Sequence, residues 1–281
     1  MATTGMVADA VREVGGERLK VTGLMGPGVD PHGYEPTVRD QQAMEGADII
    51  FYNGLHLEGH MGKIFEEMSA RLPTIAVSDG VPKDQLIAIA SFPGGHDPHI
   101  WHDAGLWKHA VEKIRDTLVE LDPGHADDYK KNAARYLGEL TALHEEVNKK
   151  AQELPEDKRV MVTAHDAFNY FGRAYGFKVH GLQGVSTETE ASVADVQNLA
   201  QFIADHKVPA IFVESSVNQK NMKAVRDAAL DKGAKVEVVG EKEDDPRKLF
   251  SDALGDAGTP EGKYAGMLRH NVKVIVAALQ N

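Results

Sequence analysis

The sequence contains no cysteine among its 281 residues. This absence excludes disulfide bonds and thiolate metal sites, so a transition metal bound by this chain would need histidine and carboxylate ligands. A chain without cysteine also suits an oxidising compartment. The sequence has no run of 18 apolar residues, so we expect no transmembrane segment, and no signal peptide is recognisable. Its abrupt start leads us to expect a trimmed N-terminus.

Positive charge is in short supply. The chain has 31 Lys and Arg residues against 43 Asp and Glu residues, which gives a formal net charge of −12. Because phosphate binding needs a basic face, nucleic acid is excluded as a likely partner class. The length suits two domains or one large one, and 42% hydrophobic residues suffice to bury a sizeable core.

The first part of the chain alternates short apolar runs with helical patterns. We expect strands at residues 21–24, 48–54 and 74–78. Helical patterns cover residues 37–47, the stretch after Glu58, and residues 104–121. Strands that alternate with helices predict a parallel α/β sheet.

A long helical pattern follows at residues 125–155, where no strand pattern occurs. Pro123 precedes this stretch, Pro155 ends it, and its apolar residues recur mostly every third or fourth position: Tyr129, Ala133, Tyr136, Leu140, Leu143, Val147 and Leu154. About 30 helical residues would make a rod roughly 45 Å long. We interpret it as a rigid connector between two lobes; the alternative is an ordinary long surface helix of one domain.

The α/β alternation then resumes. Strand patterns end near Thr163 and cover residues 210–214 and 235–240, and helical patterns cover residues 167–175, 193–206, 218–232 and 260–279. The predicted organisation is an N-terminal α/β lobe (1–122), a long connecting helix (123–155) and a C-terminal α/β lobe (156–281).

The tripeptide Asp-Pro-His occurs twice, and it ends at His32 and at His99, 67 residues apart. Each copy lies in a Gly/Pro-rich loop after a predicted strand, where open α/β sheets bind ligands, and each proline stiffens the backbone before its histidine. His165 directly follows another predicted strand, and Asp252 lies beyond the last one. Three imidazoles and one carboxylate suit a divalent first-row metal such as zinc or manganese.

Other polar residues near these loops have weaker signals. Glu214 ends a predicted strand and could bond the free nitrogen of a ligating histidine, or it could be a buried capping residue. His96 and His102 flank His99 as loop residues or outer partners. The sequence HLEGH at residues 56–60 lacks the HExxH order of metalloproteases, and we interpret it as a solvated helix start.

Six motifs, in chain order and over nearly the whole length, resemble those of the TroA/ZnuA-type metal-binding proteins of bacterial ABC importers: VDPHGYEP, DPHIWHD, TAHDAFNYFGRAYGF, STETEAS, AIFVESS and LFSDALGDAGTPEG. The resemblance implies two α/β lobes joined by one long helix, with a single metal buried between them. Carried over motif by motif, it implies His32, His99, His165 and Asp252 as the ligands. TAHDAF carries histidine rather than the glutamate of the manganese-selective members. Residues 78–97 contain one histidine, unlike the His/Asp-rich loop of dedicated zinc members.

The resemblance thus implies a function. We expect an extracytoplasmic solute-binding protein, periplasmic or a cell-surface lipoprotein, which captures one Zn2+ or Mn2+ and delivers it to an ABC permease as a monomer, without enzymatic activity. Two alternatives stay open. One is a zinc-dependent hydrolase with Glu214 or Asp166 as its base, although four protein ligands leave little room for a catalytic water. The other is a surface adhesion protein stabilised by its metal.

Overall fold

The computed structural model describes residues 1–89 and 94–280; residue 281, the last of the predicted C-terminal lobe, lies outside that description. The helices of the described chain are α1 (Gly5–Gly15), α2 (Val38–Glu45), α3 (Gly62–Ser69), α4 (Ala104–Leu121), α5 (Ala126–Ala151), α6 (Asn169–Tyr175), α7 (Val193–His206), α8 (Lys220–Asp231) and α9 (Tyr264–Leu279). The strands are β1 (Ile50–Tyr52), β2 (Thr74–Ala76), β3 (Val160–Thr163), β4 (Lys178–Gly181), β5 (Ala210–Phe212) and β6 (Glu237–Val239). Over this range, no helix has both the length and the apolar character that a membrane span requires.

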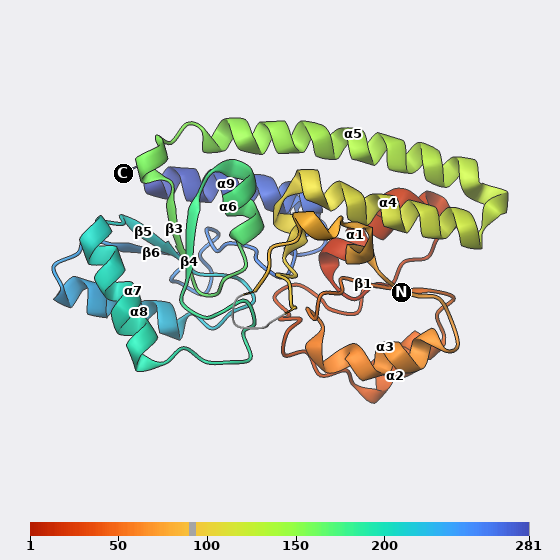
Figure 1. Cartoon of the computed structure of the whole chain (residues 1–281), viewed down its shortest axis with the longest axis horizontal. Helices are drawn as coiled ribbons and strands as arrows, with labels where there is room; N and C mark the ends of the chain where they lie inside the picture. The colour runs from red at the N-terminus through yellow and green to blue at the C-terminus, as the bar shows by residue number, and fades with distance from the viewer. Residues whose placement is uncertain (90–93, 281) are drawn as a thin grey trace.

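The strands form two separate parallel sheets, one in each half of the chain (Figure 1). The smaller sheet pairs β1 with β2, and single bridges from Ala2 to Gly23 and Phe51 extend it. The larger sheet has the order β4-β3-β5-β6. The predicted α/β class with two parallel sheets is therefore confirmed. The strand predicted at residues 21–24 is wrong, since only the bridge at Gly23 forms there.

Helix α5 lies along most of the long axis of the molecule (Figure 1). Its 26 residues span about 39 Å. Asp127 and Asp128 lie in its first turn, and Lys149 and Lys150 lie in its last, so both ends complement the helix dipole. One face is buried along the whole length and packs on α1, α4 and α9. The long helix predicted at residues 125–155 is thus present at Ala126–Ala151, and it is packed on other helices rather than free-standing.

The main hydrophobic core joins both halves of the chain. Its members include Val7 of α1, Trp107 of α4, Leu140 of α5, Phe171 of α6 and Ile275 of α9, all buried. Two smaller clusters lie under the larger sheet and beside α2 and α3. Because the shared core lies among helices, the loops at the carboxyl ends of the strands remain available for a site.

Candidate metal centre

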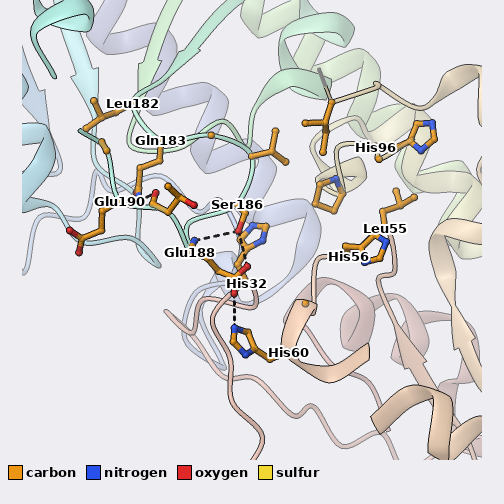
Figure 2. A pocket seen from close by; sticks show the side chains of 18 of the residues that line it. His32, Leu55, His56, His60, His96, Leu182, Gln183, Ser186, Glu188 and Glu190 are labelled. Carbon is orange, nitrogen blue, oxygen red and sulfur yellow. Dashed lines mark hydrogen bonds and ion pairs between the residues drawn. The ribbon is translucent and has the colours of Figure 1, made fainter. Parts of the chain in front are cut away.

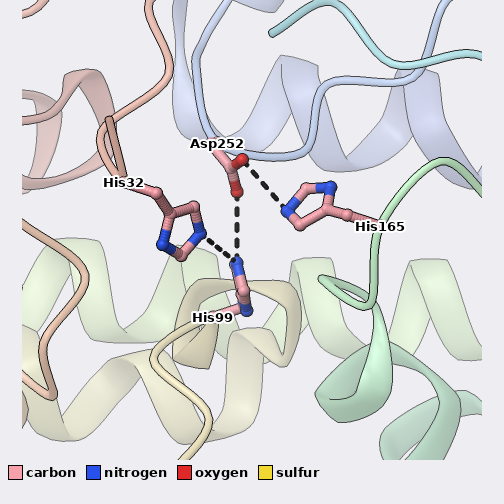
Figure 3. Close-up of side chains that lie close together, drawn as sticks. All are labelled: His32, His99, His165 and Asp252. Atoms are coloured by element: carbon pink, nitrogen blue, oxygen red, sulfur yellow. Dashed lines mark hydrogen bonds and ion pairs between the residues drawn. The ribbon is translucent and has the colours of Figure 1, made fainter. Parts of the chain in front are cut away.

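Four side chains from four distant loops meet in the interior of the protein: His32, His99, His165 and Asp252 (Figure 3). His99 directly precedes a 3-10 turn at Ile100–His102, and His165 comes two residues after β3. All four residues are buried, with at most 3% of their surface exposed. One ligand atom from each lies within 4.8 Å of the others.

His99 and Asp252 lie at the centre of this group. His99 Nε2 is 3.3 Å from His32 Nε2 and 3.3 Å from Asp252 Oδ1. His165 Nε2 is 3.1 Å from Asp252 Oδ2. Neither His165 Nε2 nor Asp252 Oδ1 has a hydrogen-bond partner among the described residues, although both atoms are buried. Buried polar atoms are normally paired, so this convergence on one point indicates a place for a cation.

The repeated tripeptide has a local structural reason. Asp30 Oδ1 accepts a hydrogen bond from the backbone N–H of His32 at 2.9 Å, and Asp97 Oδ1 accepts one from that of His99, also at 2.9 Å. Each Asp-Pro-His is therefore an Asx-type turn, in which the aspartate fixes the backbone of its own histidine. We did not single out Asp30 and Asp97 from the sequence, although the motif itself contained them.

Two carboxylates orient the rings of the deeper histidines. Asp97 Oδ1 lies 2.7 Å from His99 Nδ1, and Glu214 Oε2 lies 2.5 Å from His165 Nδ1. Glu214 Oε1 also accepts the backbone N–H groups of Ala164 and His165. Because Nδ1 of each ring is bonded to a carboxylate, Nε2 of each points into the group, as ligating imidazoles require.

The pKa shifts differ between the two Asp-Pro-His histidines. Burial alone would disfavour the His99 imidazolium, but Asp97 and Asp252 outweigh it and raise the pKa of His99 to about 9. Burial dominates at His32 and lowers its pKa to about 3. At His165, Asp252 and Glu214 likewise outweigh burial and raise the pKa. The pKa of Asp252 is lowered because His165 and His99 outweigh its burial. An incoming cation would therefore replace protons on His99 and His165.

Residues of the N-terminal half hold the Asp252 loop. The carbonyl of Ser251 accepts hydrogen bonds from Trp101 Nε1 at 2.8 Å and from His102 Nε2 at 3.1 Å. His102 also stacks on Phe168, and its burial lowers its pKa to about 3. His102 is thus a neutral outer partner of this loop, whereas His96 lines the cleft described below.

The predicted helix start at HLEGH is wrong. Residues 55–58 form a turn with positive φ at Leu55 (55°) and His56 (63°), and a 3-10 turn follows at Gly59–Met61. Glu58 is buried, and its Oε1 accepts hydrogen bonds from Asn53 N and from Thr3 Oγ1, each at 2.7 Å. The carboxylate satisfies the backbone of this turn, which explains why the segment is not a solvated helix.

A cleft of about 730 Å³ leads from the surface to His32. Its walls come from both halves of the chain: Leu55, His56, His60 and His96 lie on one side, and residues 182–186 and 188–191 lie on the other (Figure 2). His32 is the one member of the four-residue group that lines this cleft. His99, His165 and Asp252 lie behind it.

Comparison with known proteins agrees with this geometry over the whole chain. The family model described as "ZnuA: Zinc-uptake complex component A periplasmic" matches residues 1–278. The zinc-binding protein TroA of Treponema pallidum is 48% identical over 279 residues, covering 99% of this chain and 88% of that protein. The manganese-binding lipoprotein MntA of Bacillus subtilis is 43% identical over 283 residues, covering 99% and 89%.

The solved structures extend the agreement to the fold. The structure of the periplasmic zinc-binding protein TroA from T. pallidum superposes with a TM-score of 0.94 at 47% identity and covers 99% of this chain and 97% of that one. Fe(III)-bound YtgA from Chlamydia trachomatis gives a TM-score of 0.87 at 26% identity, with 99% and 96% covered. The chain therefore belongs to the ZnuA/TroA family of extracytoplasmic metal-binding transport proteins, which are not enzymes.

Proposed function

We propose that the chain is the solute-binding protein of an ABC importer and binds one divalent transition metal ion through His32, His99, His165 and Asp252. The observation that supports this most is the convergence of three imidazoles and one carboxylate, all buried, in which two polar atoms, His165 Nε2 and Asp252 Oδ1, make no hydrogen bond among the described residues. Glu214 and Asp97 orient two of the imidazoles from outside. The ion is the cargo of this protein.

Zinc is the ion that we expect to bind most tightly. Three imidazoles and one carboxylate match the tetrahedral preference of Zn2+, whereas Mn2+ prefers more oxygen ligands. A bidentate Asp252 would add an oxygen and admit manganese. The relatives span both metals, since TroA is described as zinc-binding and MntA as manganese-binding. Which ion is carried in the cell then depends on supply and on the permease.

The proposed lobes give a route for capture and release. We propose residues 1–122 and 156–281 as the lobes and 123–155 as the connecting helix. His32 and His99 come from the first lobe, and His165 and Asp252 from the second, so a small separation of the lobes would divide the ligand set in two. The core that α5 shares with α1, α4 and α9 favours such modest motion over a wide hinge.

The setting of this function follows from the family. We propose that the chain is a monomer that acts outside the cytoplasm, as a periplasmic protein or a lipoprotein at the cell surface, and that its protein partner is the membrane permease of the importer. Its net charge of −12 suits capture of cations rather than of nucleic acid.

The first test is metal content. We expect elemental mass spectrometry of protein purified without added metal to find one zinc or manganese ion per chain, and competitive titration of the stripped protein to rank zinc first. His165→Ala should weaken binding strongly. The matched control is His206→Ala, which removes an exposed histidine that stacks on Phe202. A stripped protein with no titratable site would contradict the proposal.

A second test separates transport from a purely structural metal. A transport protein must stay folded without its cargo, and the main hydrophobic core is built from apolar side chains of α1, α4, α5, α6 and α9, which pack without a metal ion. We therefore expect the metal-free protein to melt cooperatively at a temperature well above ambient. An unfolded metal-free protein would favour the metal-stabilised adhesion protein instead.

A further inference from the structure

The segment at residues 186–188 forms one wall of the cleft mouth and is braced from within its own half of the chain. Gln183 N donates to the carbonyl of Ala164 at 3.0 Å, next to His165. The Gln183 side-chain amide donates to the carbonyls of Thr187 at 3.3 Å and Thr189 at 3.0 Å. The segment is therefore built on the same strand end that presents His165.

Two side chains of this segment reach across the cleft to the other half of the chain. Thr187 Oγ1 donates a hydrogen bond to Asp30 Oδ2 at 2.5 Å. Glu188 Oε1 pairs with His60 Nε2 at 2.6 Å, as Figure 2 shows. The first contact is partly buried, whereas the second is about half exposed. The Thr187 contact is therefore less open to competition from water.

Asp30 connects this crossing contact to the proposed metal ligand. Its Oδ1 accepts the backbone N–H of His32, while its Oδ2 accepts the hydroxyl of Thr187. The same carboxylate thus holds the His32 backbone and contacts the opposite wall of the cleft. At the second Asp-Pro-His the equivalent atom, Asp97 Oδ2, also bonds a residue of the other half of the chain, Asn169, but neither of these two residues lines the cleft.

We propose that residues 186–188 form a clasp across the cleft, in which Thr187 is a positioning residue for His32 that acts through Asp30, and the Glu188–His60 pair closes the mouth. This inference rests on the proposed function. His32 is the ligand that lines the cleft, so it must move for the ion to leave by that route. While the clasp is closed, Asp30 keeps the His32 backbone in place, and the clasp therefore slows metal loss.

The rate of zinc dissociation tests the clasp. Zinc-loaded protein is mixed with excess chelator in a stopped-flow instrument, and the rate is compared for wild type, Thr187→Val and Thr187→Ser. Valine keeps the shape but loses the hydroxyl, and serine keeps the hydroxyl. A hydrogen bond to a charged group is strong enough that its loss should accelerate release about tenfold. Thr187→Ser should release zinc at a rate close to wild type.

Thr189→Val is the matched control in the same segment, because Thr189 contributes its backbone carbonyl to Gln183 and the substitution keeps that contact. Its rate should equal wild type. Thermal melting of each empty variant reports the fold separately. The Glu188–His60 pair is exposed, so Glu188→Gln should accelerate release only about twofold.

The outcomes separate the two proposals. If wild type retains zinc and Thr187→Val releases it no faster, the clasp is overturned and the proposed function stands. If Thr187→Ser accelerates release as much as Thr187→Val, packing rather than the hydroxyl matters, and the clasp is again overturned. If wild type retains no zinc, the proposed function itself fails, and the clasp with it.

Discussion

The two Asp-Pro-His loops have the same backbone turn but different surroundings. In both, the aspartate accepts the backbone N–H of its histidine at 2.9 Å. The second oxygen of each aspartate bonds the other half of the chain, Asp97 through Asn169 and Asp30 through Thr187. Asp97 also bonds the ring of His99, which is fully buried, whereas no ring contact of this kind is made by Asp30 among the described residues. The pKa of His99 is raised to about 9 by Asp97 and Asp252 against its burial, while burial lowers that of His32 to about 3.

The difference shows that the tripeptide determines the backbone conformation before each histidine, whereas the surrounding residues determine the pKa and the ring contacts of that histidine. Asp97 holds both the backbone and the ring of His99, and Asp97 is itself buried and bonded by Asn169. His32 is held partly from across the cleft, so its position depends on how the two halves meet. We interpret His99 as a residue that keeps its position during metal release and His32 as the residue that moves.

Replacing each histidine by alanine should have the largest effect on zinc affinity, and the two substitutions should differ in their effect on the stability of the metal-free protein. We expect His99→Ala and His32→Ala each to weaken zinc binding by more than the ~10–100-fold typical of outer partners. His99→Ala also removes the imidazolium that lies between the buried carboxylates of Asp97 and Asp252, so it should lower the free energy of unfolding of the metal-free protein by about 3–5 kcal/mol. His32→Ala should cost clearly less. Chemical denaturation of both empty variants checks this, and equal losses would contradict it.

Replacing the aspartate of each loop should have a smaller effect on zinc affinity, and the effect should again differ between the two loops. Asp97→Asn removes the charge that supports the His99 ring and should weaken zinc binding by about tenfold. Asp30→Asn keeps an oxygen for the His32 backbone and touches no ring, so it should weaken binding by only about threefold. Competitive zinc titration measures both. A larger loss for Asp30→Asn would mean that the contacts of Asp30 with the His32 backbone and with Thr187 matter more than ring support.

The pH dependence of binding should follow His99 rather than His32. The pKa of His99 is raised to about 9 against its burial by Asp97 and Asp252, so below about pH 9 the ring is charged and would have to lose a proton to act as the proposed ligand, whereas His32 is already neutral. Zinc affinity should therefore rise between pH 6 and pH 8, by up to about tenfold per pH unit for each proton released. Asp97→Asn should flatten this slope. Titrations at several pH values test it, and an affinity independent of pH would contradict the assignment.

Local signals in the sequence predicted much of the fold. Asp103 and Ser192 cap α4 and α7, and both helices begin and end where the pattern placed them. Strand β4 (Lys178–Gly181) was missed because only pairing with β3 makes it a strand. The helix start predicted at HLEGH was wrong because the carboxylate of Glu58 accepts hydrogen bonds from Asn53 N and from Thr3 Oγ1. A helical pattern in the sequence does not reveal such contacts.

The residues of the candidate site differed in how strongly the sequence marked them. His32 and His99 stood out because their motif repeats. His165 and Asp252 have weaker local signals, because each was marked only by its position after a predicted strand, and the family resemblance then pointed to the same two residues. Their meeting joins loops 87 residues apart in the chain. The role of Thr187 could not be predicted, because its contact with Asp30 joins residues 157 positions apart across a cleft that only the folded chain forms.

The most direct test of the central claim is a crystal structure of the zinc-loaded protein with anomalous scattering recorded at the zinc edge. We predict one strong anomalous peak per chain, about 2.0–2.2 Å from Nε2 of His32, His99 and His165 and from an oxygen of Asp252. A peak elsewhere, or a peak bound by fewer than three of these residues, would contradict it.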